Sequence, residues 1–327
     1  MYIEQVYKGL TDSWRYVVSI ILIFVGWQVF GGLPLIAAVV LKSDSLAVLA
    51  SGDLGLMAQT LGSNLFLFFM LLSFVIGLVF LLIAIKFVHK QPFLALTTSR
   101  KKIDWKRIFF AFALWGMVSI ALTAIGIYLA PEDYVFNFEP IPFFILVVIG
   151  ILFIPLQTSF EEYLFRGYLM QGIGLWAKNK WMPLVITSLV FGLLHIANPE
   201  VGKLGYGIMV FYIGTGLFLG VITLMDDGLE LALGFHAANN LFTALLVTAD
   251  WTAFQTHSLY RDVSEPKLGW DVFIPVLIIY PILLYLFSKK YKWNQWRERL
   301  TAKILAKNEF NAHGELHLTE VQHKNTM

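Results

Sequence analysis

Ionisable side chains that lie within long apolar runs of this sequence fall in three short segments. The first holds Glu161, Glu162 and Arg166, the second holds His195, and the third holds His236 with Asn240. Ionisable groups are costly in apolar surroundings and are usually functional. Glu162 and Arg166 are four residues apart, so they share a helix face and can pair, whereas Glu161 points about 100° away. One carboxylate can therefore be structural while the other does chemistry.

These residue types could together hydrolyse a peptide bond. A carboxylate and an imidazole held away from bulk water can activate a water molecule, so we assign Glu161 as the base and His195 as its partner in holding the water. Attack of water on a peptide carbonyl creates an oxyanion, and one good N–H donor to it lowers the barrier by about 3–4 kcal/mol. His236 and Asn240 share one helix face and are assigned as these donors.

A metal site is the competing interpretation of the same residues. Glu161, His195 and His236 make a plausible set of zinc ligands, although they lack the His-Glu-x-x-His spacing of soluble zinc proteases. We favour the metal-free mechanism and expect no cofactor, with Zn²⁺ as the alternative. Nucleophilic catalysis has little support, because the chain has no cysteine and Ser159 lies in no recognisable nucleophile elbow.

Each segment also has a plainer, non-catalytic interpretation. The two glutamates could be solvated charges at a helix end, and His195 could bond a backbone carbonyl near another helix end. His236 and Asn240 could join neighbouring helices by hydrogen bonds. A transporter or proton relay is a further class, but a relay needs polar residues that reach both membrane faces, and here they cluster at one depth.

The composition indicates that lipid is the main solvent of this chain. It has 327 residues, 58% of them hydrophobic and 14% charged, and a mean hydropathy of +0.70. Soluble domains carry about 25% charged residues. The net charge of +2 provides no overall field for binding nucleic acid, and none is expected as a partner.

The apolar runs predict an all-α polytopic membrane protein with about eight transmembrane helices around an intramembrane catalytic cavity. The expected spans are residues 16–40, 61–88, 107–130, 142–176, 181–197, 206–225, 229–249 and 271–288. Residues 1–15 are expected to form an interfacial segment, 16–288 the transmembrane domain with a catalytic core at about 142–250, and 289–327 a cytoplasmic C-terminal tail. The oligomeric state cannot be read from the sequence.

The distribution of basic loops predicts that both termini are cytoplasmic. Basic residues concentrate after the second, fourth and eighth spans, at 86–107, 178–180 and 289–299, whereas the loops after the first and third spans are acidic. Helical rise places Glu161 and His195 at similar distances, some 20–25 Å, from the 178–180 turn. His236 is expected to lie shallower, so its convergence with them needs a tilted helix or a deep cavity.

At these residues the sequence resembles the CAAX protease and bacteriocin-processing family, also called the Abi family, which includes the type II CAAX prenyl endopeptidases. Three motifs carry the resemblance: Glu161-Glu162-x-x-x-Arg166, Phe191-x-x-x-His195 and His236-x-x-x-Asn240. They stand in the family's order, each on an apolar helix, within about residues 142–250.

The resemblance implies an eight-helix intramembrane protease with a conical cavity open to cytosol and lipid. We expect the protein to lie in a bacterial plasma membrane. The resemblance also implies the roles already assigned to Glu161, His195, His236 and Asn240. Asn198 matches an asparagine that often ends the second motif, and we group it with Glu162 and Arg166 as supporting residues.

The resemblance does not identify the substrate beyond a membrane-associated peptide or protein. A non-catalytic membrane scaffold or bacteriocin-immunity protein on the same fold is the alternative function.

Overall fold

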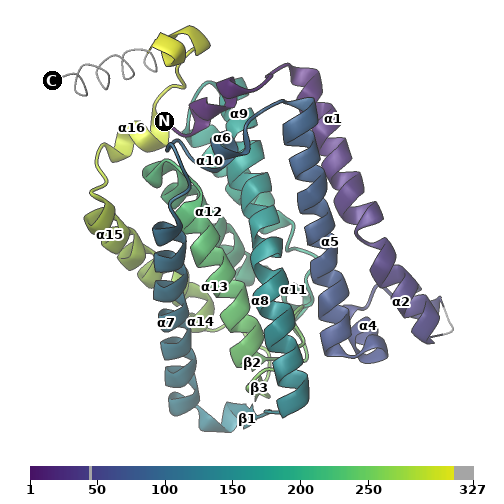
Figure 1. Cartoon of the computed structure of the whole chain (residues 1–327). Coiled ribbons are helices and arrows are strands. Elements are labelled where there is room, and N and C mark those ends of the chain that lie inside the picture. The colour runs from purple at the N-terminus through teal and green to yellow at the C-terminus, as the bar shows by residue number, and fades with distance from the viewer. Residues whose placement is uncertain (44–45, 313–327) are drawn as a thin grey trace.

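The computed structural model describes residues 1–43 and 46–312 and shows a bundle of helices with a very small β-sheet at one end (Figure 1). The N-terminus lies at the opposite end of the bundle. The expectation of an all-α polytopic membrane protein is confirmed.

Among the described residues, 6 helical stretches are long and apolar enough to cross a membrane. They are Ser13–Ser43, Ser63–Val88, Trp105–Leu129, Pro140–Ala177, Tyr206–Asp226 and Trp270–Tyr291. The other two expected spans are also helical but shorter: α10 (Trp181–Leu193) and α13 (Glu230–Leu246). The predicted count of eight spans is therefore not confirmed.

Several of these stretches are built from more than one helical segment. The first joins α1 (Ser13–Phe24), a π-helical segment (Val25–Phe30) and α2 (Leu33–Ser43). The second is α5 (Ser63–Ile83) with the π-helical segment Ala84–Val88, and the third is α7 (Trp105–Leu129) alone. The fourth joins α8 (Pro140–Glu162), the π-helical segment Tyr163–Leu169 and α9 (Met170–Ala177). The fifth is the 3-10 turn Tyr206–Ile208 with α12 (Met209–Asp226), and the sixth joins α14 (Trp270–Ile274), the π-helical segment Pro275–Ile279 and α15 (Tyr280–Tyr291).

Local sequence explains where α8 and its continuation begin and end. Pro140 stands at the first helical position, where its missing N–H is not needed. After Glu162 the backbone widens into the π-helical segment, a feature that is frequent at functional sites. The helix ends after α9 because Lys178 adopts a left-handed conformation, with φ of 56°.

Helix α13 lies inside the bundle and packs against α7, α8 and α12. All of its side chains from Glu230 to Ala238 are buried. The close approach to α7 depends on Gly234, because any β-carbon there would collide with the backbone carbonyl of Ile108. This glycine stands two residues before His236 and so brings the third motif into the centre of the bundle.

The end of the bundle that carries the sheet is formed by short elements. Strand β3 (Tyr260–Asp262) lies between β1 (Tyr134–Phe136), to which it is antiparallel, and β2 (Val247–Thr248), to which it is parallel. The 3-10 turn Pro131–Asp133 precedes β1, and the short helices α3 (Ala47–Ala50), α4 (Leu54–Leu61) and α11 (Pro199–Leu204) connect longer ones. We call this end the strand end.

The opposite end gathers the basic loops, and we call it the basic end. It contains the 3-10 helix Ile3–Lys8, α6 (Phe93–Thr97) and α16 (Trp296–Thr301). Arg100 and Arg107 both bind Asp226, and Arg100 also binds Glu230 at 3.0 Å. These ion pairs hold the 98–107 loop over the turn between α12 and α13.

Two terminal segments pack on the protein more extensively than the sequence indicates. Ile3 and Val6 are buried, and Ile3 belongs to a core cluster with Met170, so the apolar side chains of this part of the expected interfacial segment do not face lipid. The first part of the tail also packs inward, because Ile304 contacts that cluster. The remainder of the predicted polar tail, from residue 313, lies outside the described residues.

Candidate active site

The first motif forms a buried ion pair at the junction of α8 and the π-helical segment. Arg166 Nη1 donates to Glu162 Oε1 at 2.9 Å, and both side chains are 0% exposed. Arg166 Nη2 donates to the backbone carbonyl of Gly216 on α12 at 3.1 Å. These two charges are therefore not the solvated helix end of the plainer interpretation.

His236 lies between the two glutamates. Its Nδ1 is 2.7 Å from Glu162 Oε1, and its Nε2 is 3.4 Å from Glu161 Oε2. The spacing of the motifs pairs Glu162 only with Arg166, so the contact with His236 is an addition from the tertiary structure. Glu162 thus orients the imidazole of the third motif as well as the helix of the first.

His236 reaches Glu161 although helical rise places it shallower than the other two motifs. The turn before α13 lies beneath the basic end, with Asp226 3% exposed and Glu230 0% exposed. The loop that carries Arg100 and Arg107 therefore covers this turn, so α13 is withdrawn from the surface from its first residue. His236 was expected to lie shallower than the other motifs, but it contacts Glu161 directly.

The hydrogen bonds of the two histidines define which ring nitrogen carries the proton in the neutral form. His195 Nδ1 is 2.8 Å from the carbonyl oxygen of Phe191, which can only accept, so Nδ1 is the donor. An ionised Glu162 beside Arg166 likewise requires an N–H at Nδ1 of His236. In both rings Nε2 then remains as the acceptor.

Asn240 is oriented by a chain of side-chain hydrogen bonds. Trp115 Nε1 donates to Asn239 Oδ1 at 3.1 Å, and Asn239 Nδ2 donates to Asn240 Oδ1 at 3.0 Å. Asn240 Nδ2 in turn donates to Gln157 Oε1 at 3.0 Å. Because the amide nitrogen has two hydrogens, one remains available for another acceptor.

His195 follows the end of α10 and belongs to a second polar group. Its ring stacks on Tyr212, with ring centroids 4.4 Å apart. Tyr212 donates to Glu200 Oε1 at 2.5 Å, and Asn198 Nδ2 donates to the same oxygen at 3.1 Å. Glu200 Oε2 accepts from the backbone N–H of Ala253 at 3.0 Å. The Asn198 side chain therefore acts on the His195 ring through this group, and the Asn198 backbone N–H donates directly to the carbonyl of His195 at 3.0 Å.

The four candidate catalytic residues line one cavity of about 510 Å³. Asn198 also lines it, whereas Glu162 and Arg166 lie behind its wall. The cavity brings together residues from the three motifs, which the sequence separates by up to 79 positions from Glu161 to Asn240 (240 − 161).

Four further polar residues line the cavity beside the predicted site residues: Gln157, Asn239, Tyr212 and Glu200. Gln157 precedes Glu161 by four residues, so helical spacing alone could have identified it. Asn239 is adjacent to Asn240 in the chain. Glu200 lies five residues after His195 in the chain, whereas no spacing pattern connects Tyr212 with His195.

The residues fit a zinc site in chemistry but not in arrangement. Two histidines that donate Nδ1–H and direct Nε2 elsewhere, in His236 toward Glu161, have the form that metal ligands take. However, no three His, Cys, Asp or Glu side chains within the described ranges are grouped so that they could hold a metal ion.

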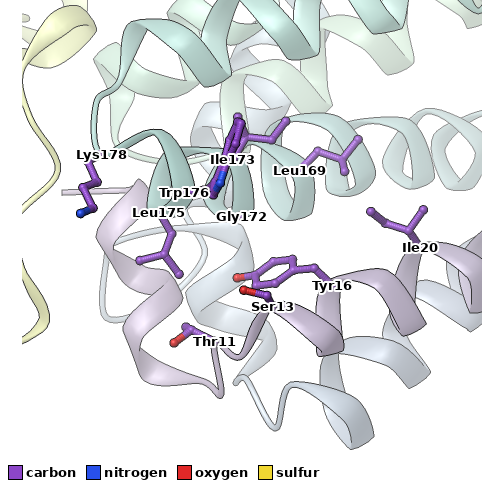
Figure 2. Close-up of a pocket in the computed structure, with 10 residues that line it drawn as sticks. All are labelled: Thr11, Ser13, Tyr16, Ile20, Leu169, Gly172, Ile173, Leu175, Trp176 and Lys178. Atoms are coloured by element: carbon purple, nitrogen blue, oxygen red, sulfur yellow. The ribbon is translucent and has the colours of Figure 1, made fainter.

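A second cavity, of about 470 Å³, lies away from these residues between α1 and α9 (Figure 2). Tyr16 and Ser13 from α1 face Gly172 and Trp176 from α9. None of the candidate catalytic residues lines it, and its wall is mostly apolar.

Comparison with known proteins finds similarity in the part of the chain that carries the three motifs. Residues 137–242 match the model of a family described as type II CAAX prenyl endopeptidase Rce1-like, and the match includes all three motifs. The chain is also 29% identical over 294 residues to the uncharacterized protein YyaK of Bacillus subtilis strain 168, covering 88% of this chain and 96% of that protein. No solved structure matches the chain. Residues 137–242 are therefore similar to the Rce1-like type II CAAX prenyl endopeptidases, a family of membrane proteases, and the chain is an integral membrane protein.

Proposed function

We propose that the protein is an intramembrane endopeptidase that hydrolyses a peptide bond of a membrane-associated peptide or protein. The observation that carries the proposal is the contact of Glu161 with His236 at 3.4 Å on the wall of a cavity that Asn240 and His195 also line. Carboxylate, imidazole and amide groups are the parts needed to activate water and to bind an oxyanion.

In this mechanism a water molecule bound between Glu161 and the Nε2 atom of His195 attacks the carbonyl carbon of the substrate. Glu161 accepts one proton from the water as the new carbon–oxygen bond forms, and the carbonyl π electrons move to the oxygen. Collapse of the tetrahedral intermediate breaks the carbon–nitrogen bond, and Glu161 returns the proton to the departing amine. The 13% exposure of the Glu161 side chain is consistent with access to water from the cavity.

His236 and Asn240 stabilise the oxyanion. Asn240 contributes the amide hydrogen that Gln157 does not use. Since Nδ1–H of His236 is directed to Glu162, Nε2 donates only when the ring is protonated. A protonated His236 gives Glu161, Glu162, Arg166 and His236 a summed charge of zero, which suits a group so largely withdrawn from water. Glu162 and Arg166 hold this ring in place.

The mechanism needs no cofactor, and Zn²⁺ bound by Glu161, His195 and His236 is the alternative that the experiment must test. The lipid bilayer is the surroundings of the reaction, and nucleic acid has no part in it. We place the protein in a bacterial plasma membrane with both termini in the cytoplasm, because the basic loops gather at the end where the N-terminus lies (Figure 1).

The test compares wild type with Glu161→Gln and the matched control Glu139→Gln, an exposed glutamate at the start of the same helix. Each purified protein is incubated in detergent with a mixed library of membrane peptides, with and without a strong chelator, and products are identified by mass spectrometry. We expect cleavage by wild type and the control but not by Glu161→Gln, unchanged by chelator. Loss on chelation and recovery with zinc would replace the metal-free mechanism. Equal product from Glu161→Gln and wild type would contradict the proposed role of Glu161, and no cleavage by any protein would favour the scaffold or immunity function.

A further inference from the structure

The catalytic cavity reaches sideways to Trp27, Met70 and Phe74, and along the bundle it extends toward the strand end. From the motif residues it follows the second half of α13, where Asn240 and Thr243 line it, and then reaches Val247 at the start of β2. It continues past the loop residues Trp251–Phe254 and reaches Asp271, which is exposed at the strand end. The cavity is therefore open toward the strand end.

The side of the site toward the basic end is closed by packed side chains. Every residue of α13 from Glu230 to Ala238 is buried. Glu162 and Arg166 are 0% exposed, and a core cluster that includes Phe160 and Leu233 fills the space beside them. In the described part of the chain, no residue of the basic loops 86–107, 178–180 or 289–304 lines the cavity.

The two ends of the bundle differ strongly in charge. The basic end carries most of the lysines and arginines of the chain, among them Arg100, Lys101, Lys102, Lys178, Lys180, Lys289 and Lys290. The loops at the strand end carry Lys42, Lys203, Arg261 and Lys267 amid a larger number of acidic residues. Short basic loops stay in the cytoplasm, so the strand end faces the other side of the membrane.

We infer that the active site is reached from the non-cytoplasmic side of the membrane, and that its substrate is a membrane-inserted peptide whose cleaved bond is presented at that side. The inference rests on the proposed peptidase function. It departs from the cytosolic opening that the family resemblance implies, because a cytosolic opening and cytoplasmic basic loops are incompatible in this bundle. The exposed apolar residues Leu193, Leu194 and Ile196 beside His195 provide the lipid-facing side from which such a peptide approaches.

The absence of cysteine from the chain allows a direct test with single-cysteine variants. Thr243→Cys places a thiol on the cavity wall, Lys267→Cys places one on the strand-end surface, and Lys101→Cys places one on the basic-end surface. Intact bacterial cells that express each variant are treated with a membrane-impermeant maleimide, before and after permeabilisation. Labelling in detergent verifies that each thiol reacts.

We expect Thr243→Cys and Lys267→Cys to be labelled in intact cells, and Lys101→Cys to be labelled only after permeabilisation. Labelling of Thr243→Cys only after permeabilisation would overturn the inference, as would its failure to react in cells under both conditions. Failure of Lys267→Cys to react in intact cells would overturn the orientation on which the inference depends. Labelling requires no turnover, so adding Glu161→Gln to each single-cysteine variant should leave the labelling pattern unchanged. Failure of the proposed peptidase function would be seen separately, in the cleavage assay.

Discussion

The contact between His236 and Glu162 makes a specific prediction for Glu162→Gln. Glu162 Oε1 meets both Arg166 Nη1 at 2.9 Å and His236 Nδ1 at 2.7 Å in a place with no exposure of the glutamate. Glutamine retains the shape and one acceptor oxygen but removes the negative charge. Arg166 then remains as a buried cation that has lost its negatively charged partner and donates only to neutral oxygens, the new amide and the Gly216 carbonyl.

The size of the effect follows from these contacts. Removing one partner of a buried ion pair destabilises a protein by about 3–5 kcal/mol. We expect the lower end, about 3 kcal/mol, because the amide oxygen and the Gly216 carbonyl still accept from Arg166. The double variant Glu162→Gln with Arg166→Met carries no unpaired charge and should regain most of this loss, since an apolar group replacing a buried charge is often neutral or stabilising.

Activity should not recover with stability. In serine proteases, replacing the carboxylate beside the catalytic imidazole by an amide lowers kcat by roughly 10⁴-fold. His236 here has the same kind of partner, so both the single and the double variant should cleave peptide at least about 100-fold more slowly than wild type.

The assay combines thermal unfolding in detergent with cleavage rates on a peptide selected from the library, and Glu139→Gln again serves as the control. Wild-type stability and rate in Glu162→Gln would refute the reasoning, because the carboxylate would then neither pair with Arg166 nor orient His236. A double variant no more stable than Glu162→Gln would refute the assignment of the loss to an unpaired Arg166.

Three further predictions concern neighbouring groups. Asn240→Ala should lower kcat by about 10²–10³-fold with little change in KM, because one oxyanion donor is lost. Gln157 only orients the Asn240 amide, so Gln157→Ala should lower kcat by a smaller factor. Glu200→Gln removes the negative charge that accepts the backbone N–H of Ala253 and so joins α11 to that loop. We expect the variant to be nicked faster by an added protease near residue 253 and to cleave its own substrate more slowly. Equal rates of nicking in the variant and wild type would contradict this. Burial lowers the pKa of His89 below its ordinary value of 6.5. The unfolded chain therefore binds a proton at His89 more readily than the folded protein does. The free energy of unfolding should fall as pH decreases from 7.5 to about 5.5. His89→Gln should have a flatter dependence of Tm on pH, and an unchanged slope would refute the contribution of this residue.

Local spacing in the sequence determined much of the site. The pairing of Glu162 with Arg166 and the common face of His236 and Asn240 follow from the i, i+4 geometry of a helix. The apolar runs determined that the chain is an all-α membrane protein, and the four residues that the motifs marked as catalytic candidates all line the cavity. These features depend on residues within one or two helical turns, which periodicity describes well.

Contacts between helices were decided only by the tertiary structure. The depth of His236 depends on the buried turn before α13 and on the close approach that Gly234 permits, and neither has a periodic signature. The bond from Asn240 to Gln157 and the stacking of His195 on Tyr212 join segments whose relative rotation no local pattern specifies. The direction of the cavity also belongs here, because it depends on which end of the site packed side chains fill, and packing is a property of all the helices together.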